Sequence, residues 1–233
     1  MKSIYNHTAR HQVPSTAKLA IFCLFPEGTQ SHRNNLMNDL LKASTTISEF
    51  CKSFDFEKDT WEISWKVPEG MILDAIKSIP RHLKHTNPSL QIHLVLFSHG
   101  FDGQLCFTPN VSSQAIIETL IGLKMLQLQT VSLLACQSLK GIQLPKKLPF
   151  NLLGFREDIY TNELLFFTAR LLYWYSICSN FGESIKHAQR YALITSKSIV
   201  YRNKNLWLSE YRPFEANCPY YSLPTVTPTK QQQ

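Results

Sequence analysis

The sequence lacks most of the features that would assign a protein to a class at first sight. Its six cysteines include no C-x-x-C pair, which argues against a zinc knuckle and a thioredoxin-type redox motif. No apolar run approaches the roughly 20 residues that a membrane span needs. The first 19 residues contain no apolar core of the kind found in signal peptides. These absences predict a soluble, cytoplasmic protein that does not enter the membrane.

What the chain does contain is enough apolar material for one sizeable globular domain. Of its 233 residues, 44% are hydrophobic and 18% are charged, a balance that argues against a disordered or fibrous chain. The net charge of +7 is compatible with an acidic partner such as a nucleic acid. Lys and Arg nowhere alternate with aromatic residues at a regular spacing, however, so we do not expect nucleic-acid binding.

Apolar stretches and stretches of helical period alternate along most of the chain. Short apolar stretches predict strands at 18–25, 61–65, 91–97, 104–107, 129–135 and 150–155. Apolar residues at helical spacing predict helices at 31–50, 68–83, 112–126, 160–177 and 183–196. This alternation predicts an α/β fold with a mostly parallel central sheet of about six strands, flanked by helices.

We expect a single domain over 18–198, preceded by an N-terminal extension over 1–17. Beyond it, 199–233 forms an aromatic C-terminal segment that we expect to be irregular, and 224–233 has the composition of a disordered tail. No internal repeat divides the chain, and no linker interrupts it before that tail.

Two neighbouring predicted strands end in residues that can carry chemistry. His99 follows the strand over 91–97, and Cys136 follows the strand over 129–135. Because the carboxyl ends of parallel strands meet at one edge of a sheet, we expect both side chains in one cleft. There His99 can activate the Cys136 thiol for attack on a carbonyl carbon. The backbone N–H groups of Gly100 and Cys136 can form an oxyanion hole for the resulting intermediate.

The sequence around these strand ends resembles the caspase-like cysteine peptidases. The matching stretches are Leu94–Gly100, an apolar strand ending in His-Gly, and Val131–Ser138, an apolar strand that leads into Ala-Cys-Gln-Ser. Ser98–Gly103 is similar to the caspases themselves, whereas Ala135–Ser138 is closer to the bacterial CHAT and separase-like branch. In the order of predicted elements, the resemblance extends over about 18–192.

This resemblance implies a caspase-like three-layer sandwich and a cysteine endopeptidase that cleaves a protein partner. His99 would be the general base and Cys136 the nucleophile, and this chemistry needs neither a metal nor an organic cofactor. Bacterial relatives of this kind often act as defence or cell-death effectors. The resemblance therefore also implies an activation step, by an activating protein partner, by the protein's own cleavage or by dimerisation.

Three acidic residues near the two strand ends are candidates for contacts with the substrate. Asp102 follows His-Gly by two residues, and we treat it as either a substrate contact or a plain loop acid. Glu157 and Asp158 follow the strand over 150–155, where they can select Arg or Lys through charge-assisted hydrogen bonds. They fit equally well as acids at a helix N-terminus. Arg156 keeps open the opposite preference, for an acidic substrate residue.

Two other functions are compatible with the sequence. The chain can be an interaction protein that keeps the caspase-like fold without using its His–Cys pair, although inactive relatives usually lose one of these residues. It can also bind a phosphorylated ligand over the basic stretch 140–147. The lack of a Gly-rich phosphate loop after any predicted strand weakens this last alternative.

Overall fold

The computed structural model describes most of the predicted domain. The described residues are 13–27, 60–160, 163–164, 167–168, 170–171, 174, 180–190 and 199–202.

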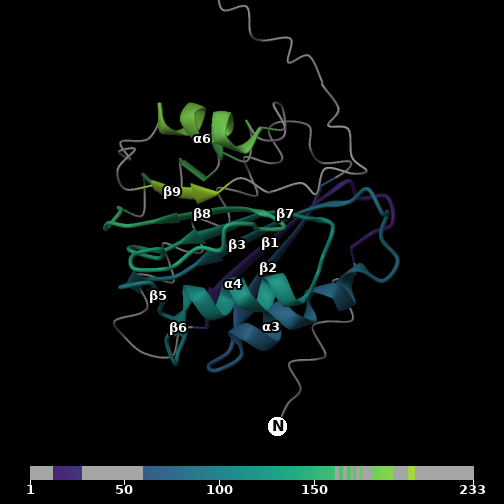
Figure 1. The fold of residues 1–233 in the computed structure, drawn as a ribbon. Coiled ribbons are helices and arrows are strands. Elements are labelled where there is room, and N and C mark those ends of the chain that lie inside the picture. The colour runs from purple at the N-terminus through teal and green to yellow at the C-terminus, as the bar shows by residue number, and fades with distance from the viewer. Residues whose placement is uncertain are drawn as a thin grey trace, which may run out of the picture.

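Six strands form one sheet in the order β2-β1-β3-β7-β8-β9 (Figure 1). They are β1 (Leu19–Pro26), β2 (Thr60–Val67), β3 (Gln91–Phe97), β7 (Leu128–Leu134), β8 (Asn151–Phe155) and β9 (Ile199–Arg202). The first five strands in this order are parallel, and β9 runs antiparallel to β8. The predicted α/β fold with a mostly parallel sheet of about six strands is thus confirmed.

The sheet lies between two layers of helix, because both of its faces are apolar. On one face lie α3 (Ile72–Ser78) and α4 (Ser113–Gly122), and on the other lies α6 (Phe181–Gln189) (Figure 1). In β3, Leu94 and Leu96 pack into the cluster that contains α3 and α4. Val95 and Phe97 pack into the cluster that contains α6. Successive side chains of a strand point to opposite faces, so one buried strand supports both layers.

The helix predicted over 68–83 is broken by a proline. α3 ends at Ser78, and a 3-10 helix, η2 (Ile79–Leu83), takes its place. Pro80 has no N–H to donate to Ile76, so the α-helical hydrogen-bond pattern cannot continue through it.

The helix predicted over 112–126 begins and ends within that range. Ser112 caps α4, since its Oγ accepts a hydrogen bond from the Ala115 N–H at 3.1 Å. Beyond Leu123, the backbone of Lys124 adopts a φ of +50°, a left-handed conformation that ends the helix.

The C-terminal part of the domain differs from the sequence expectation at one strand. The sequence predicts an irregular chain from Ile199 onward, but Ile199–Arg202 pairs with β8 as β9. Only four residues take part, too few to show a strand period in the sequence.

Several predicted segments lie outside the described residues: the helix over 31–50, the tail over 224–233 and the end of the helix over 183–196. The helix predicted over 160–177 is described at some positions only. There the Thr168 hydroxyl donates to the Leu164 carbonyl at 2.8 Å, four residues earlier, as in a helix. Leu164, Phe167 and Leu171 pack on the same face of the sheet as α6.

A second, small sheet follows β3. It consists of β4 (Gly100–Phe101), β5 (Gln104–Leu105) and β6 (Val111–Ser112), all antiparallel. The turn between β4 and β5 is Asp102-Gly103, with φ values of +42° and +75°. Positive φ at both positions is typical of a tight two-residue hairpin, which turns the chain back directly after His99.

Candidate active site

His99 and Cys136 lie beyond the ends of adjacent parallel strands. The last paired residues of β3 and β7 are Phe97 and Leu134, and each candidate lies two residues further along its strand. The two chains stay in contact one residue beyond β3, because the Ser98 N–H donates to the Leu134 carbonyl at 3.4 Å. The structure therefore brings both candidates to the same edge of the sheet. His99 is exposed there, and Cys136 is partly buried.

Gly100 packs directly against the turn that carries Cys136. A Cβ atom at Gly100 would overlap the Cys136 carbonyl oxygen and would lie 2.8 Å from the Ala135 Cβ. Only a residue without a side chain fits at this position. Gly100 thus allows the segment after His99 and the segment around Cys136 to lie in contact.

The two backbone N–H groups predicted to form an oxyanion hole are not used by the surrounding secondary structure. The Cys106 N–H donates to the His99 carbonyl at 2.8 Å, so His99 and Cys106 are a hydrogen-bonded pair. Gly100 and Leu105 are the next pair of the ladder. Since hydrogen-bonded and non-hydrogen-bonded pairs alternate along an antiparallel ladder, the Gly100 N–H points away from β5. The Cys136 N–H donates no backbone hydrogen bond to any other described residue.

The turn at Cys136 is anchored by Ser138, a fully buried residue that is not among the predicted site residues. The Ser138 hydroxyl donates to the Leu133 carbonyl at 2.8 Å and accepts from the Phe155 N–H at 3.1 Å. The Ser138 carbonyl accepts from the Ser113 hydroxyl at 2.5 Å, at the start of α4. These bonds connect β7, β8 and α4 and fix the backbone just after Cys136.

The Cys136 thiol contacts the backbone of Ile159, in the segment that follows β8. The Ile159 N–H donates to Cys136 Sγ at 3.3 Å, and Sγ donates to the Ile159 carbonyl at 3.5 Å. No hydrogen bond between His99 and Cys136 occurs among the contacts of the described residues. Ile159 was not a predicted site residue. Because only its backbone takes part, its residue type carries no signal of the contact.

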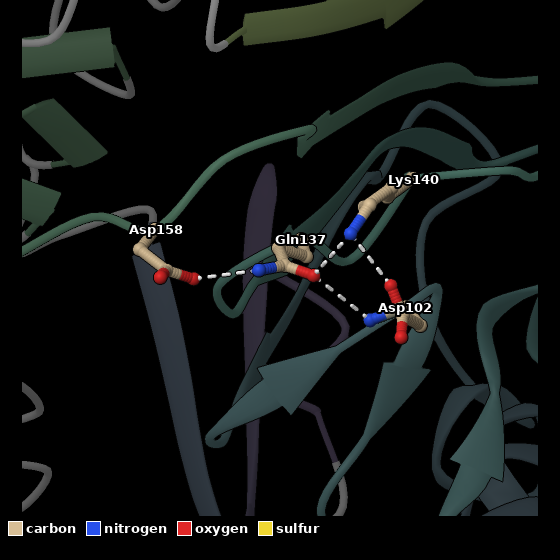
Figure 2. A network of polar contacts seen from close by, with 4 residues as sticks. All are labelled: Asp102, Gln137, Lys140 and Asp158. Atoms are coloured by element: carbon tan, nitrogen blue, oxygen red, sulfur yellow. Dashed lines mark hydrogen bonds and ion pairs between the residues drawn. The ribbon is translucent and has the colours of Figure 1, made fainter.

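Gln137, the residue after Cys136, connects Asp102 and Lys140 to Asp158 (Figure 2). Its Oε1 accepts from the Asp102 N–H at 3.2 Å and from Lys140 Nζ at 3.1 Å. Its Nε2 donates to Asp158 Oδ1 at 3.0 Å, and Lys140 also forms an ion pair with Asp102 at 2.7 Å. The predicted substrate contacts Asp102 and Asp158 therefore belong to one polar cluster, the Gln137 network of Asp102, Gln137, Lys140 and Asp158.

This arrangement of strands has a counterpart among solved structures. A secreted C11 cysteine protease from Bacteroides thetaiotaomicron, solved in complex with an irreversible peptide inhibitor, matches with a TM-score of 0.52 and 10% sequence identity. The fold is caspase-like. The match covers 75% of this chain and 58% of the protease, so this chain spans little more than half of that protein's length. No family model matches the sequence, and a search of the curated proteins found no match.

In this caspase-like domain, the third predicted substrate contact also lies beside the Cys136 turn. Glu157 is exposed, and its backbone carbonyl accepts from the Gln137 N–H at 3.1 Å. The basic stretch over 140–147 begins with Lys140, whose charge is paired with Asp102 within the Gln137 network.

No described helix is both long enough and apolar enough to cross a membrane. In the same part of the chain, no three His, Cys, Asp or Glu residues gather in a way that could hold a metal ion.

Proposed function

We propose that the protein is a cysteine endopeptidase that cleaves a protein partner through a thioester intermediate. His99 takes the proton of the Cys136 thiol, and the sulfur attacks the carbonyl carbon of the scissile amide. The tetrahedral intermediate then breaks its C–N bond, and the leaving amine receives the proton from His99. Water, deprotonated by His99, attacks the thioester and releases the carboxylic acid and the thiol. These steps require neither a metal nor an organic cofactor.

One observation carries this proposal. His99 and Cys136 each lie two residues beyond the last paired residues of neighbouring parallel strands, at the edge where α/β proteins bind their ligands. The close packing of Gly100 against the Cys136 carbonyl supports it, since this contact keeps the two segments together.

We assign the stabilisation of the oxyanion to the backbone N–H groups of Gly100 and Cys136. Both groups donate no backbone hydrogen bond within the described part of the chain, so both are available to a developing negative charge. Donors that are fixed before the reaction stabilise such a charge without reorganisation.

For recognition of the substrate we propose Asp102, Glu157 and Asp158. All three are exposed, and all contact the Cys136 turn through Gln137. Glu157 and Asp158 favour Arg or Lys before the scissile bond through charge-assisted hydrogen bonds, whereas the Asp102 carboxylate is paired with Lys140. Arg156, next to Glu157, supports the opposite preference, and the experiment below separates the two.

We further propose that the activity is regulated, as in a cytoplasmic defence or cell-death effector of the CHAT type that responds to an activating protein. The Ile159 backbone on the Cys136 sulfur supports this, because a nucleophile in contact with its own chain is less accessible to a substrate. The peptide inhibitor bound to the C11 protease supports a peptide-like substrate for this fold.

The alternative is an interaction protein that keeps this fold without catalysis. The observation in its favour is that the Cys136 thiol hydrogen-bonds to Ile159 and forms no described hydrogen bond with His99.

The proposed function is tested by covalent labelling with thiol-reactive peptidyl probes that carry Arg, Lys, Leu or Asp at the position before the reactive group. We expect labelling of Cys136 that is lost in Cys136→Ala and strongly reduced in His99→Ala. The preferred probe assigns the role of the three carboxylates. If Cys136 in the wild-type chain reacts no faster than in His99→Ala, both with and without a cell lysate that can supply an activator, the interaction protein is the better description.

A further inference from the structure

Gln137 is partly buried and bonds to segments before and after the Cys136 turn. Besides its side-chain bonds to Asp102, Lys140 and Asp158, its N–H donates to the Glu157 carbonyl at 3.1 Å. Its own carbonyl accepts from the backbone N–H groups of Gly103, at 2.9 Å, and Lys140, at 3.0 Å. Its φ is +51°, a left-handed conformation that a residue with a side chain adopts at a cost.

The side chain of Gln137 has the chemistry that this position requires. The amide accepts hydrogen bonds at Oε1, on the side of Asp102 and Lys140, and donates one at Nε2, on the side of Asp158 (Figure 2). A carboxylate of the same length would have only acceptors and would face the Asp158 carboxylate with like charge. A thioether of similar length would form none of these bonds with comparable strength.

The bonds on the Asp158 side determine where Ile159 lies. Gln137 donates hydrogen bonds to the two residues directly before Ile159. Its N–H donates to the Glu157 carbonyl, and its Nε2 donates to the Asp158 carboxylate. The Ile159 carbonyl in turn accepts the hydrogen bond of the Cys136 thiol. The Ile159 N–H also donates to this sulfur, at 3.3 Å. Both backbone groups of Ile159 therefore contact the sulfur that a substrate must reach.

We propose that Gln137 is a positioning residue that holds the segment Glu157–Ile159 against the Cys136 sulfur. The inference rests on the proposed function, in which this sulfur is the nucleophile. A substrate must displace Ile159 before the thiol can transfer its proton to His99. Loss of the Gln137–Asp158 hydrogen bond lowers the cost of that displacement and makes the sulfur more reactive.

The test measures the rate at which iodoacetamide alkylates Cys136 in the full-length chain, by mass spectrometry of the peptide that contains it. The variants are Gln137→Met, which loses the amide without a change of charge, and Asp158→Leu, which loses the acceptor. Asp158→Asn is the matched control, because it loses the same charge as Asp158→Leu but keeps an oxygen that can accept from Gln137. Cys106, which is partly buried and whose N–H bonds to the His99 carbonyl, serves as an internal reference.

We expect Cys136 to react about three- to tenfold faster in Gln137→Met and Asp158→Leu, the range for loss of one hydrogen bond. In Asp158→Asn the rate should stay within about twofold of the wild-type rate. The proposal is overturned if neither Gln137→Met nor Asp158→Leu reacts faster. It is also overturned if Asp158→Asn matches Asp158→Leu, which would assign the effect to charge, or if Cys106 accelerates equally, which would indicate general loosening.

His99→Ala separates this inference from the proposed function. If His99→Ala leaves the alkylation rate of Cys136 unchanged both in the wild-type chain and in Gln137→Met, where Ile159 is released, the dyad is wrong, while the rates of the single Gln137 and Asp158 variants still decide the role of Gln137. If His99→Ala slows alkylation and Gln137→Met equals the wild type, the dyad stands and the role given to Gln137 is wrong.

Discussion

His93 is a histidine that the fold keeps neutral. It lies inside β3, fully surrounded by protein, with Nδ1 2.5 Å from the Thr130 hydroxyl of β7. Burial lowers the pKa of His93 from 6.5 to about 4. In the unfolded chain the imidazole binds a proton near pH 6.5, whereas in the folded chain it does so only near pH 4. The contribution of neutral His93 to the free energy of unfolding is therefore complete above pH 6.5 and is lost as the pH falls toward 4.

We predict that the wild-type protein loses about 3 kcal/mol of its free energy of unfolding through His93 between pH 7 and pH 4. Urea unfolding at several pH values in this range measures the loss. His93→Gln has no titrating group, so its free energy of unfolding should fall less steeply over the same range. Parallel curves for the two proteins would show that His93 is not responsible for the acid sensitivity.

Ser138 is the side chain on which the position of Cys136 depends. Its hydroxyl is buried and makes two hydrogen bonds, to the Leu133 carbonyl and from the Phe155 N–H. Ser138→Ala removes both bonds and leaves the Phe155 N–H without this acceptor, whereas the Leu133 carbonyl still accepts from the Ala135 N–H at 3.0 Å. We expect the change to lower the free energy of unfolding by about 1–3 kcal/mol. Thermal and urea unfolding check this. Ser89→Ala, at an exposed turn, should change stability by less than about 0.5 kcal/mol. Equal effects of the two changes would contradict the anchoring role.

At the scale of elements, β4 can contact the end of β7 because Gly100 has no side chain. In Gly100→Ala the new methyl group would overlap the Cys136 carbonyl, so β4 and the Cys136 turn must separate. We predict a loss of about 1–3 kcal/mol of stability and about a 100-fold drop in labelling of Cys136 by the preferred peptidyl probe.

The control for Gly100 is Gly122, the last residue of α4. A Cβ atom at Gly122 meets nothing within 4 Å, so Gly122→Ala should retain full labelling and wild-type stability or better. Labelling that survives in Gly100→Ala would mean that the two segments can separate without harm. In that case the Gly100 amide has no place in the oxyanion hole.

For the molecule as a whole, hydrophobic pattern was enough to predict the sheet but not its last strand. The runs of β3 and β7 are mostly apolar and only seven residues long, shorter than most helices, and all but one side chain of each is buried, which is typical of central parallel strands. β9 has four residues and two exposed side chains, and it forms because β8 offers an unpaired edge. Such pairing depends on the partner strand and is not encoded in the segment itself.

The same limit applies to the candidate site. His99, Gly100 and Cys136 could be predicted because strand ends and residue types mark them in the sequence. The contacts of Ile159 and the left-handed backbone of Gln137 could not, since backbone atoms have no residue-specific signal. Whether the three predicted carboxylates bind substrate stays a prediction. The structure adds that all three residues bond to Gln137, Asp158 through its carboxylate and Asp102 and Glu157 through backbone atoms.

The extent of the folded domain can be tested at β9. The sequence predicts a domain over 18–198, yet Ile199 and Val200 pack against the two apolar clusters and β9 pairs with β8 along four residues. A chain ended at residue 198 exposes the edge of β8, whose Leu152 and Leu153 are fully buried. We predict that its Tm is about 5–10 °C lower than that of a chain ended at residue 204, and that it aggregates more readily. Calorimetry and light scattering compare the two. Equal Tm values would mean that β9 adds nothing to stability and that the boundary at 198 is the better one.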